Sequence, residues 1–221
     1  HDCLRRKQYL KKYVHVTTPE VYGSTDGGWI REHNHFAPST PYAVSRAACD
    51  LHLLSFQKTY DFPVVFTRAA NVYGPGQQLY RIIPRAMLSA RTGKPMQLHG
   101  GGHSERSFIH IQDVVRATLQ LALEAKPGST WHLSTREAIS IRTLVENICE
   151  QCGIKFDSVV EDTGERLGKD QSYLLDSTAM RKHFGWSDQV SLTDGLADTL
   201  AWVDTHLEHL KTLPWTYQHK A

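Results

Sequence analysis

Along the 221-residue chain, segments with the hydrophobic spacing of β-strands alternate with segments that have the spacing of α-helices. Tyr13–Thr17 is a β-branched run in which polar and apolar residues alternate, and this pattern predicts a strand. Pro41 begins a segment with apolar residues at roughly helical spacing, which predicts a helix that ends near Tyr60. The continuous apolar run Phe62–Arg68 predicts a strand buried in a parallel sheet. Further helices are expected at 4–12, 81–92, 114–125, 141–152, 178–184 and 193–207, and further strands at 96–99, 108–111, 130–134 and 156–161.

Strands and helices therefore alternate over the whole sequence, and no internal repeat is visible. This order is typical of α/β proteins. It predicts a wound parallel sheet accompanied by a smaller mixed lobe.

Composition narrows the range of partners and compartments. The formal net charge of +2 is small and the basic residues are scattered, so nucleic acid is not an expected partner. No run of about 18 apolar residues occurs, so no membrane span is expected. The four cysteines do not form a disulfide framework and neither end resembles a signal peptide, which favours a cytoplasmic setting. Cys149 and Cys152 form a lone C-x-x-C without a second Cys/His pair, so we expect ordinary helix cysteines and no metal site.

Candidate chemistry is concentrated in two places. Thr17, Thr18 and Glu20 come where the first predicted strand ends, and this edge of an open α/β sheet is where ligands bind. Tyr42 and Arg46 are four residues apart and therefore share one face of the following helix. A neighbouring cation lowers the pKa of a phenol and makes it a usable base. A single Tyr-x-x-x-Arg pair also occurs as a surface tyrosine over an arginine stem, so its meaning depends on the other motifs.

Five spaced motifs together resemble the nucleotide-sugar dehydratases, a group of extended short-chain dehydrogenases/reductases. They are Thr17–Gly23 (TTPEVYG), Pro41–Ser45 (PYAVS), Arg68–Pro75 (RAANVYGP), Arg106–Asp113 (RSFIHIQD) and Glu165–Asp170 (ERLGKD). Their order and spacing cover almost the whole chain. The resemblance is greatest to 4,6-dehydratases.

The resemblance implies a reaction on a nucleoside-diphosphate sugar that begins with oxidation at C4 by bound NAD. Tyr42 corresponds to the base of that step, and Thr18 to the hydroxyl that holds the 4-oxygen. Glu20 corresponds to the carboxylate that removes the C5 proton before water is lost across C5 and C6. Arg46 takes the place of the motif cation, and the residues expected to contact NAD are Thr17, Tyr42, Arg46 and Ala69.

The resemblance also implies a substrate site and a division into domains. The residues expected to bind the nucleotide-sugar are Asn71, Arg81, Ile82, Leu98, Arg106, Arg166 and Lys169. Residues 1–75 would form the carboxyl-terminal part of a Rossmann-like, doubly wound NAD-binding domain, and 76–221 mainly a smaller α/β substrate lobe, with about 104–125 returning to the Rossmann domain. A homodimer through the tyrosine-bearing helix is expected.

Two positions depart from the 4,6-dehydratase pattern. Pro19 stands where an aspartate usually protonates the leaving 6-hydroxyl, and Arg46 stands where lysine is usual. A related decarboxylase, 5,6-dehydratase or 4-epimerase, or a non-catalytic nucleotide-sugar-binding relative, therefore remains an alternative. The G-x-G-x-x-G turn of a dinucleotide site and its N-terminal βαβ unit are absent from this sequence.

Overall fold

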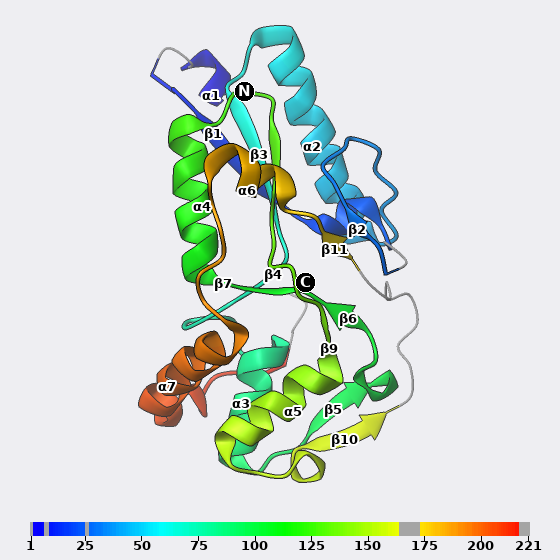
Figure 1. The fold of residues 1–221 in the computed structure, drawn as a ribbon, viewed down its shortest axis with the longest axis vertical. Helices are drawn as coiled ribbons and strands as arrows, with labels where there is room; N and C mark the ends of the chain where they lie inside the picture. Colours follow the sequence, from blue (N-terminus) through cyan, green and yellow to red (C-terminus); the bar gives the residue numbers. More distant parts are fainter. Residues whose placement is uncertain (1, 7–8, 25–26, 164–172, 217–221) are drawn as a thin grey trace. The chain divides into compact units, whose positions relative to one another are not determined.

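The computed structural model describes residues 2–6, 9–24, 27–163 and 173–216 (Figure 1). The chain forms two compact units, each assembled from three separate stretches of sequence. Unit 1 comprises the described residues of His1–Val72, Arg106–Ala138 and Gly168–Gln189, and unit 2 those of Tyr73–Glu105, Ile139–Leu167 and Val190–Ala221. Unit 1 thus includes the described residues of 106–138 and of 173–189.

Unit 1 is built on a parallel sheet with the strand order β1-β3-β8. β1 spans Tyr13–Thr17, β3 spans Val64–Ala69 and β8 spans Thr130–Leu133. Thr17 is the register partner of Arg68 at the end of the β1–β3 ladder. Because the strands are parallel, their carboxyl ends meet at one edge of the sheet.

Two helices cover opposite faces of this sheet (Figure 1). α2 spans Pro41–Tyr60, and its Leu54 packs with Val64 and Phe66 of β3. α4 spans Ile111–Glu124, and its Ala117 and Leu121 belong instead to a cluster with Val65. Successive side chains of a strand point to opposite faces, so these two clusters are the two layers of the core.

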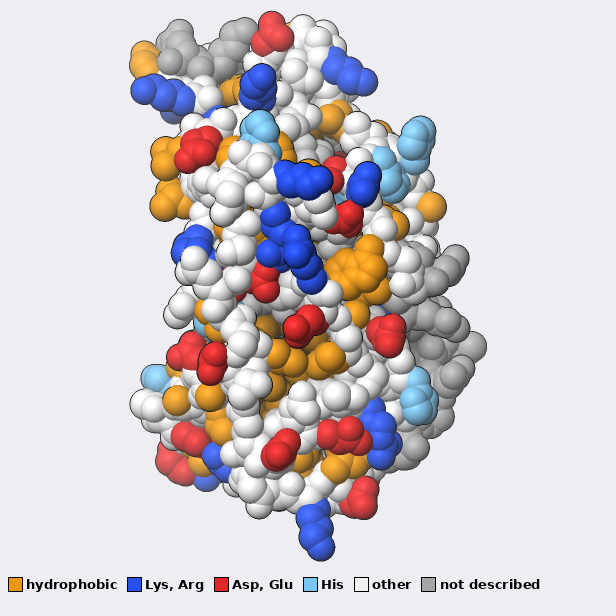
Figure 2. All heavy atoms as spheres, viewed as in Figure 1, with side chains coloured by type: hydrophobic (Ala, Val, Ile, Leu, Met, Phe, Trp, Pro, Cys, Tyr) orange, Lys and Arg blue, Asp and Glu red, His pale blue; other side chains and the backbone are white. Residues whose placement is uncertain are grey.

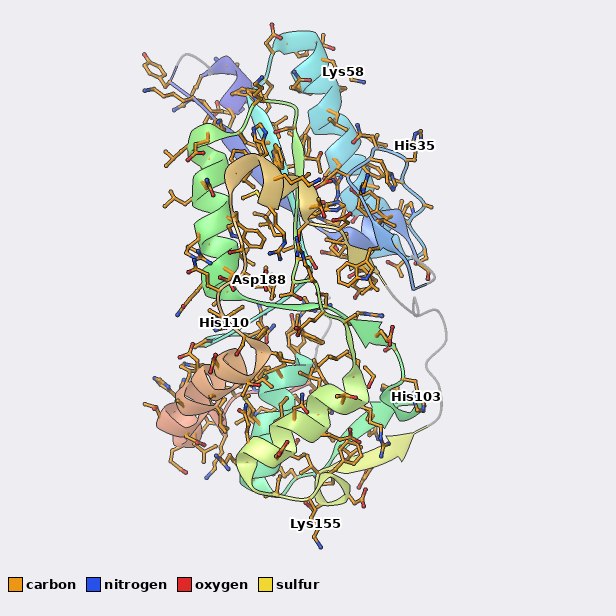
Figure 3. The ribbon with its side chains drawn as sticks, in the orientation of Figure 1. His35, Lys58, His103, His110, Lys155 and Asp188 are labelled. Carbon is orange, nitrogen blue, oxygen red and sulfur yellow. The ribbon has the colours of Figure 1, made fainter. Side chains whose placement is uncertain are left out.

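Shorter elements complete unit 1. They are α1 (Asp2–Arg5), the 3₁₀ helix η1 (Pro19–Tyr22), β2 (Trp29–Ile30), β7 (Phe108–His110), β11 (Leu174–Leu175) and α6 (Thr178–Phe184). β2 and β11 pair in parallel, and Arg181 of α6 forms an ion pair with Asp188, which Figure 3 labels. β4 (Asn71–Tyr73) and β6 (Glu105–Arg106) lie where the chain passes between the units.

Unit 2 packs helices beside a small sheet. Its elements are α3 (Ile82–Thr92), β5 (Met96–His99), the 3₁₀ turn η2 (Gly100–Gly102), β9 (Ile139–Ser140), α5 (Ile141–Cys152), the 3₁₀ turn η3 (Phe156–Ser158), β10 (Val160–Thr163) and α7 (Leu192–Leu210). β5 and β10 are parallel. Arg91 of α3 and Asp204 of α7 form a two-pronged ion pair of 2.6 and 2.9 Å. Gly195 in α7 leaves room for Tyr73, because a Cβ there would lie 2.2 Å from the tyrosine hydroxyl oxygen.

The α/β order predicted from the sequence is confirmed, with two local errors. The helix expected at 4–12 ends at Arg5, and by Tyr13 the backbone N–H already donates to the Pro63 carbonyl at 2.9 Å. The strand expected at 156–161 starts as η3, because the Val159 N–H bonds the Phe156 carbonyl and closes a local turn. The short strands β2, β4, β6, β9 and β11 were missed, because strands of two or three residues carry no periodic signal.

One face of α4 exposes an apolar stripe. Ile111, Val115, Leu119 and Leu123 follow at four-residue spacing and are 37%, 56%, 61% and 72% exposed. Val16 on the edge strand β1 is 60% exposed as well. A contiguous apolar surface of this kind is typical of a contact with another segment or another protein. The charged side chains on the face drawn in Figure 2 are, in contrast, of mixed sign.

A buried histidine predicts acid sensitivity of unit 1. His132 of β8 is fully buried, and its Nε2 lies 2.9 Å from the Tyr22 hydroxyl oxygen. Burial, assisted by the positive charge of Arg68, lowers the pKa of His132 to about 3. Between the usual histidine pKa of about 6.5 and this value the unfolded chain binds a proton that the folded chain does not. The free energy of unfolding should therefore be unaffected by His132 above about pH 6.5 and should decrease as the pH falls toward 3.

Replacing His132 should remove this pH dependence. In His132→Gln, we expect the slope of the free energy of unfolding against pH between 7 and 5 to decrease by up to about 1.4 kcal/mol per pH unit. Urea denaturation at each pH measures the slope. His35→Gln is the control, because His35 is an exposed loop residue (Figure 3). Equal slopes in the wild-type protein and in His132→Gln would contradict the prediction.

Candidate active site

The candidate site begins where β1 ends. Thr18 caps η1, and its Oγ1 accepts a hydrogen bond from the Glu20 N–H at 3.3 Å. Pro19 occupies the first helical position, where no N–H is needed. Gly23 ends η1 with φ of 77°, and a Cβ there would lie 2.4 Å from the Ala37 carbonyl oxygen. The half-buried Glu20 is therefore held on a short helix that is fixed at both ends.

The helix α2, which carries Tyr42 and Arg46, packs against η1. Thr40 caps this helix by accepting the Ala43 N–H at 3.1 Å, and Pro41 follows it. Ala47 packs in one cluster with Val21 and Tyr22 of η1. A small side chain at this contact lets the two backbones come close together, so the element that bears Glu20 lies against the helix that bears Tyr42.

Arg46 is bound to the strand end. Its Nη2 donates to the Val16 carbonyl at 2.8 Å, while its Nε is buried and has no hydrogen-bond partner among the described residues. The Tyr42 side chain is 55% exposed. The predicted roles of Arg46 beside the phenol, and of Tyr42 beside Thr18 and Glu20, stay predictions.

A buried polar cluster lies behind these residues. Asp50 of α2 is fully buried and forms a 2.7 Å ion pair with Arg68, whose side chain is 1% exposed. The predicted cofactor residue Thr17 donates to the same carboxylate at 3.1 Å. The sequence motifs contain Arg68, but the role of Asp50 was missed. The available signal was its position four residues after Arg46, on the same helix face.

The end of β3 carries the next predicted residues. Ala69 is half-buried. Asn71 is anchored to the segment before β7, because its side-chain Nδ2 and its backbone N–H both donate to the Ser107 carbonyl, at 3.1 and 3.0 Å. The predicted contact of Asn71 with the sugar-nucleotide would therefore use an amide whose orientation is already set.

Arg106 is a buried cation rather than a surface one. It is 3% exposed, and its guanidinium carbon lies 4.2 Å from the centre of the Tyr173 ring. Tyr173 was missed by the sequence analysis, and a cation over an aromatic face is favourable where water is excluded. The predicted Arg166 and Lys169 lie outside the described residues.

The remaining predicted substrate residues belong to unit 2. Arg81 precedes α3 and is exposed, with its guanidinium carbon 5.5 Å from the centre of the Tyr80 ring. Ile82 is half-buried at the start of α3. Leu98 of β5 is only 4% exposed and packs against Gly102, where a Cβ would lie 2.8 Å from the leucine Cδ2. The role predicted for Leu98 therefore falls on a residue of the unit 2 core.

The C-x-x-C pair lies within α5. Cys149 is buried, and burial raises the pKa of its thiol to about 11, while burial also raises the pKa of Cys152. Neither is a thiolate near neutral pH, which argues against nucleophilic or redox chemistry. In the part of the chain that the structure describes, no group of three or more His, Cys, Asp or Glu side chains could hold a metal ion. No described helix is long and apolar enough to cross a membrane.

Known proteins share this sequence and this geometry. A dTDP-glucose 4,6-dehydratase of Streptomyces niveus is 35% identical over 193 residues, which are 87% of this chain and 57% of that protein. The structure of DesIV, a dTDP-glucose 4,6-dehydratase of Streptomyces venezuelae with NAD bound, matches with a TM-score of 0.87 at 32% identity. The match covers 94% of this chain and 63% of DesIV.

A relative with a different ligand is also similar. MoeE5 in complex with UDP-glucuronic acid and NAD matches with a TM-score of 0.84 at 28% identity, over 92% of this chain and 67% of MoeE5. The chain thus spans a little over half of the curated relative and about two thirds of the solved structures.

These likenesses confirm the Rossmann-like α/β fold and the resemblance to nucleotide-sugar dehydratases that the five motifs indicated. The family model described as GDP-mannose 4,6 dehydratase matches residues 2–199. The chain therefore belongs to the GDP-mannose 4,6 dehydratase family.

Proposed function

We propose that the protein containing this chain is an NAD-dependent nucleotide-sugar 4,6-dehydratase. The observation that carries the proposal is the contact between η1, which bears Glu20, and α2, which bears Tyr42 and Arg46, at the carboxyl end of β1. A half-buried carboxylate and a phenol on two packed elements are the acid–base pair that oxidation followed by elimination requires. Relatives named dTDP-glucose 4,6-dehydratase support it.

The residues present fit a nicotinamide dinucleotide. The buried Nε of Arg46, which has no hydrogen-bond partner among the described residues, is a donor suited to a ribose hydroxyl. Thr17 and Ala69 end adjacent strands at the sheet edge where dinucleotides bind. When bound, NAD supplies the hydride acceptor at C4 and the hydride donor at C6. DesIV and MoeE5 were both solved with NAD, which supports the same cofactor here.

The chain's own side chains divide the proton chemistry between them. Tyr42 takes the proton of the 4-hydroxyl, and Thr18 holds the 4-oxygen. Once the 4-keto group has acidified C5, the half-buried Glu20 removes the C5 proton. The same proton, returned by Glu20 directly or through water, leaves with the 6-hydroxyl as water. Arg106, with Arg166 and Lys169, would bind the pyrophosphate, since guanidinium groups bind phosphate oxygens in pairs.

A second function is favoured by Pro19, which is buried and has no proton to give to a leaving 6-hydroxyl. An enzyme that decarboxylates or 4-epimerises a nucleotide-uronic acid expels no 6-hydroxyl and needs no proton donor at this position. A 5,6-dehydratase does expel that hydroxyl and would take the proton from another group. The likeness to MoeE5, solved with UDP-glucuronic acid, supports the same alternative.

We also propose a homodimer and a cytoplasmic location. α2 leaves Val44 and Leu51, seven residues apart, 52% and 53% exposed, and an apolar helix face suits a symmetric contact. All four cysteines are free, which suits a reducing compartment. Fractionation of cells that produce the protein would test the location.

The reaction is tested with the complete protein, NAD and a panel of nucleoside-diphosphate hexoses and hexuronic acids. We expect a 4-keto-6-deoxy product from one hexose. Tyr42→Phe should lower kcat by about 100-fold or more, because it removes the general base. Tyr60→Phe, at the other end of the same helix, is the matched control and should keep wild-type turnover. Binding without any keto product, decarboxylation or epimer would make the protein a non-catalytic relative.

Glu20→Gln separates elimination from epimerisation. In a 4,6-dehydratase this variant should lose both the product and the exchange of the C5 hydrogen with solvent deuterium, while a 4-epimerase should keep its turnover. Mass spectrometry of the recovered sugar nucleotide measures the exchange. Glu150→Gln, an exposed residue of α5, is the control. Wild-type exchange in Glu20→Gln would exclude Glu20 as the C5 base.

Leu51→Glu tests the dimer. A charge in the middle of an apolar contact leaves a desolvated, unpaired carboxylate, so we expect this variant to sediment as a monomer at concentrations where the wild-type protein is a dimer. Leu213→Glu, a 39% exposed leucine after α7, should leave the dimer intact. A wild-type monomer, or a Leu51→Glu dimer of unchanged strength, would contradict this interface.

A further inference from the structure

The helix that bears Tyr42 carries one buried carboxylate to which the proposed chemistry gives no role. Asp50 is 0% exposed and lies eight residues after Tyr42. Its Oδ2 accepts hydrogen bonds from Arg68 Nη2 at 2.7 Å and from Thr17 Oγ1 at 3.1 Å. Its Oδ1 lies 3.2 Å from His15 Nε2. One carboxylate of α2 therefore contacts side chains of both β1 and β3.

The two hydrogen-bond donors occupy a special position in the sheet. Thr17 and Arg68 are register partners, and they lie at the carboxyl end of the β1–β3 ladder. A single oxygen of Asp50 thus binds both members of one pair. One turn earlier on α2, Arg46 donates to the carbonyl of Val16, the residue before Thr17. Two attachments one turn apart fix both the rotation of α2 and its position along its own axis relative to the strand end.

The charge of Asp50 is needed where it lies. Arg68 is 1% exposed, its guanidinium carbon lies 4.9 and 5.1 Å from the centres of the Tyr22 and Phe36 rings, and its Nε and Nη1 have no hydrogen-bond partner among the described residues. A buried cation held in this way depends on its counter-ion. Two well-packed apolar side chains in place of Asp50 and Arg68 would stabilise the fold at least equally. The stability of the fold alone therefore does not explain why an ion pair is buried at this position.

We propose that Asp50 is a positioning residue that sets the separation between Tyr42 and the Thr18–Glu20 segment. Thr18 and Glu20 lie in the segment that follows Thr17, and Tyr42 lies in the first turn of the helix to which Asp50 belongs. The Asp50 carboxylate therefore links the helix that bears Tyr42 to the strand end that precedes Thr18 and Glu20. The inference rests on the proposed function for its effect on turnover, but its effect on geometry can be measured separately.

The first test is Asp50→Asn in the complete protein. Asparagine keeps the shape and one acceptor oxygen but removes the charge. We expect kcat to fall about tenfold or more, because a displacement of the order of 1 Å at a reacting group costs up to about 100-fold. The KM for the nucleotide-sugar should change by less than about twofold, since Asp50 contacts none of the residues expected to bind the substrate.

Asp113→Asn is the matched control. Asp113 is also fully buried in unit 1, is ion-paired with Arg116 and accepts the Gln189 N–H at 3.0 Å. We expect this variant to lose stability but to keep kcat at temperatures where it is folded. An equal loss of kcat in Asp113→Asn, or wild-type kcat in Asp50→Asn, would overturn the proposal.

Thr17→Val provides a second variant if Asp50→Asn fails to fold. It removes one donor to the carboxylate and leaves the ion pair with Arg68 intact. On its own, Thr17→Val should lower kcat. Where Asp50→Asn folds as well, the two losses of kcat in a double-mutant cycle should be clearly non-additive, because both substitutions break the same contact. Fully additive losses would count against the proposal.

Hydrogen exchange measures the geometry without turnover. The Glu20 and Gly23 N–H groups are bonded within η1, to Thr18 Oγ1 and to the Glu20 carbonyl. We expect these amides to exchange faster in Asp50→Asn and in Thr17→Val, but not in Asp113→Asn. If the wild-type protein turns over no nucleotide-sugar, the proposed function fails while this measurement still decides the role of Asp50. Unchanged exchange at η1 in both variants would refute the positioning role.

Discussion

The candidate site depends on one constraint, the seating of α2 against the carboxyl ends of two parallel strands. The Asp50 carboxylate binds Thr17 and Arg68, which face each other across the β1–β3 ladder, and Arg46 binds the Val16 carbonyl one turn away. Parallel strands end at one edge, so a helix fixed at that edge is fixed relative to everything that follows the strands. η1 follows β1 directly and packs on the same helix.

The two departures from the 4,6-dehydratase pattern have a clear structural meaning. Pro19 begins η1, where a missing N–H costs nothing and the fixed φ favours the helical turn. What it gives up is a side-chain proton, and that loss makes acid catalysis at this position impossible. Arg46 reaches a backbone carbonyl with one end of its planar fork and keeps a second nitrogen unpaired among the described residues. A lysine ammonium is a single point charge, whereas the planar guanidinium makes this anchoring contact and still has a further N–H donor.

Unit 1 carries exposed apolar side chains on β1 and α4. Val16 on the edge strand and the stripe from Ile111 to Leu123 on α4 form apolar surface at the margin of the sheet. The chain spans 57% of the Streptomyces niveus relative and 63% of DesIV. It also lacks the glycine-rich turn that binds a dinucleotide pyrophosphate.

Local pattern determined the long elements, and tertiary packing decided the rest. The ends of β1, α2, β5, α5 and α6 follow from periodicity and capping residues such as Thr40 and Pro41, since these signals act within a few residues of the chain. The motifs identified the family because each is a short continuous stretch of sequence that can be recognised without the fold. The pairing of β2 with β11, the assignment of the last segments of unit 1, and the burial of Arg68 and Arg106 depend on partners distant in sequence. The sequence around Asp50 does not indicate which strands its side chain contacts. Only the folded chain shows that its carboxylate binds both Thr17 and Arg68.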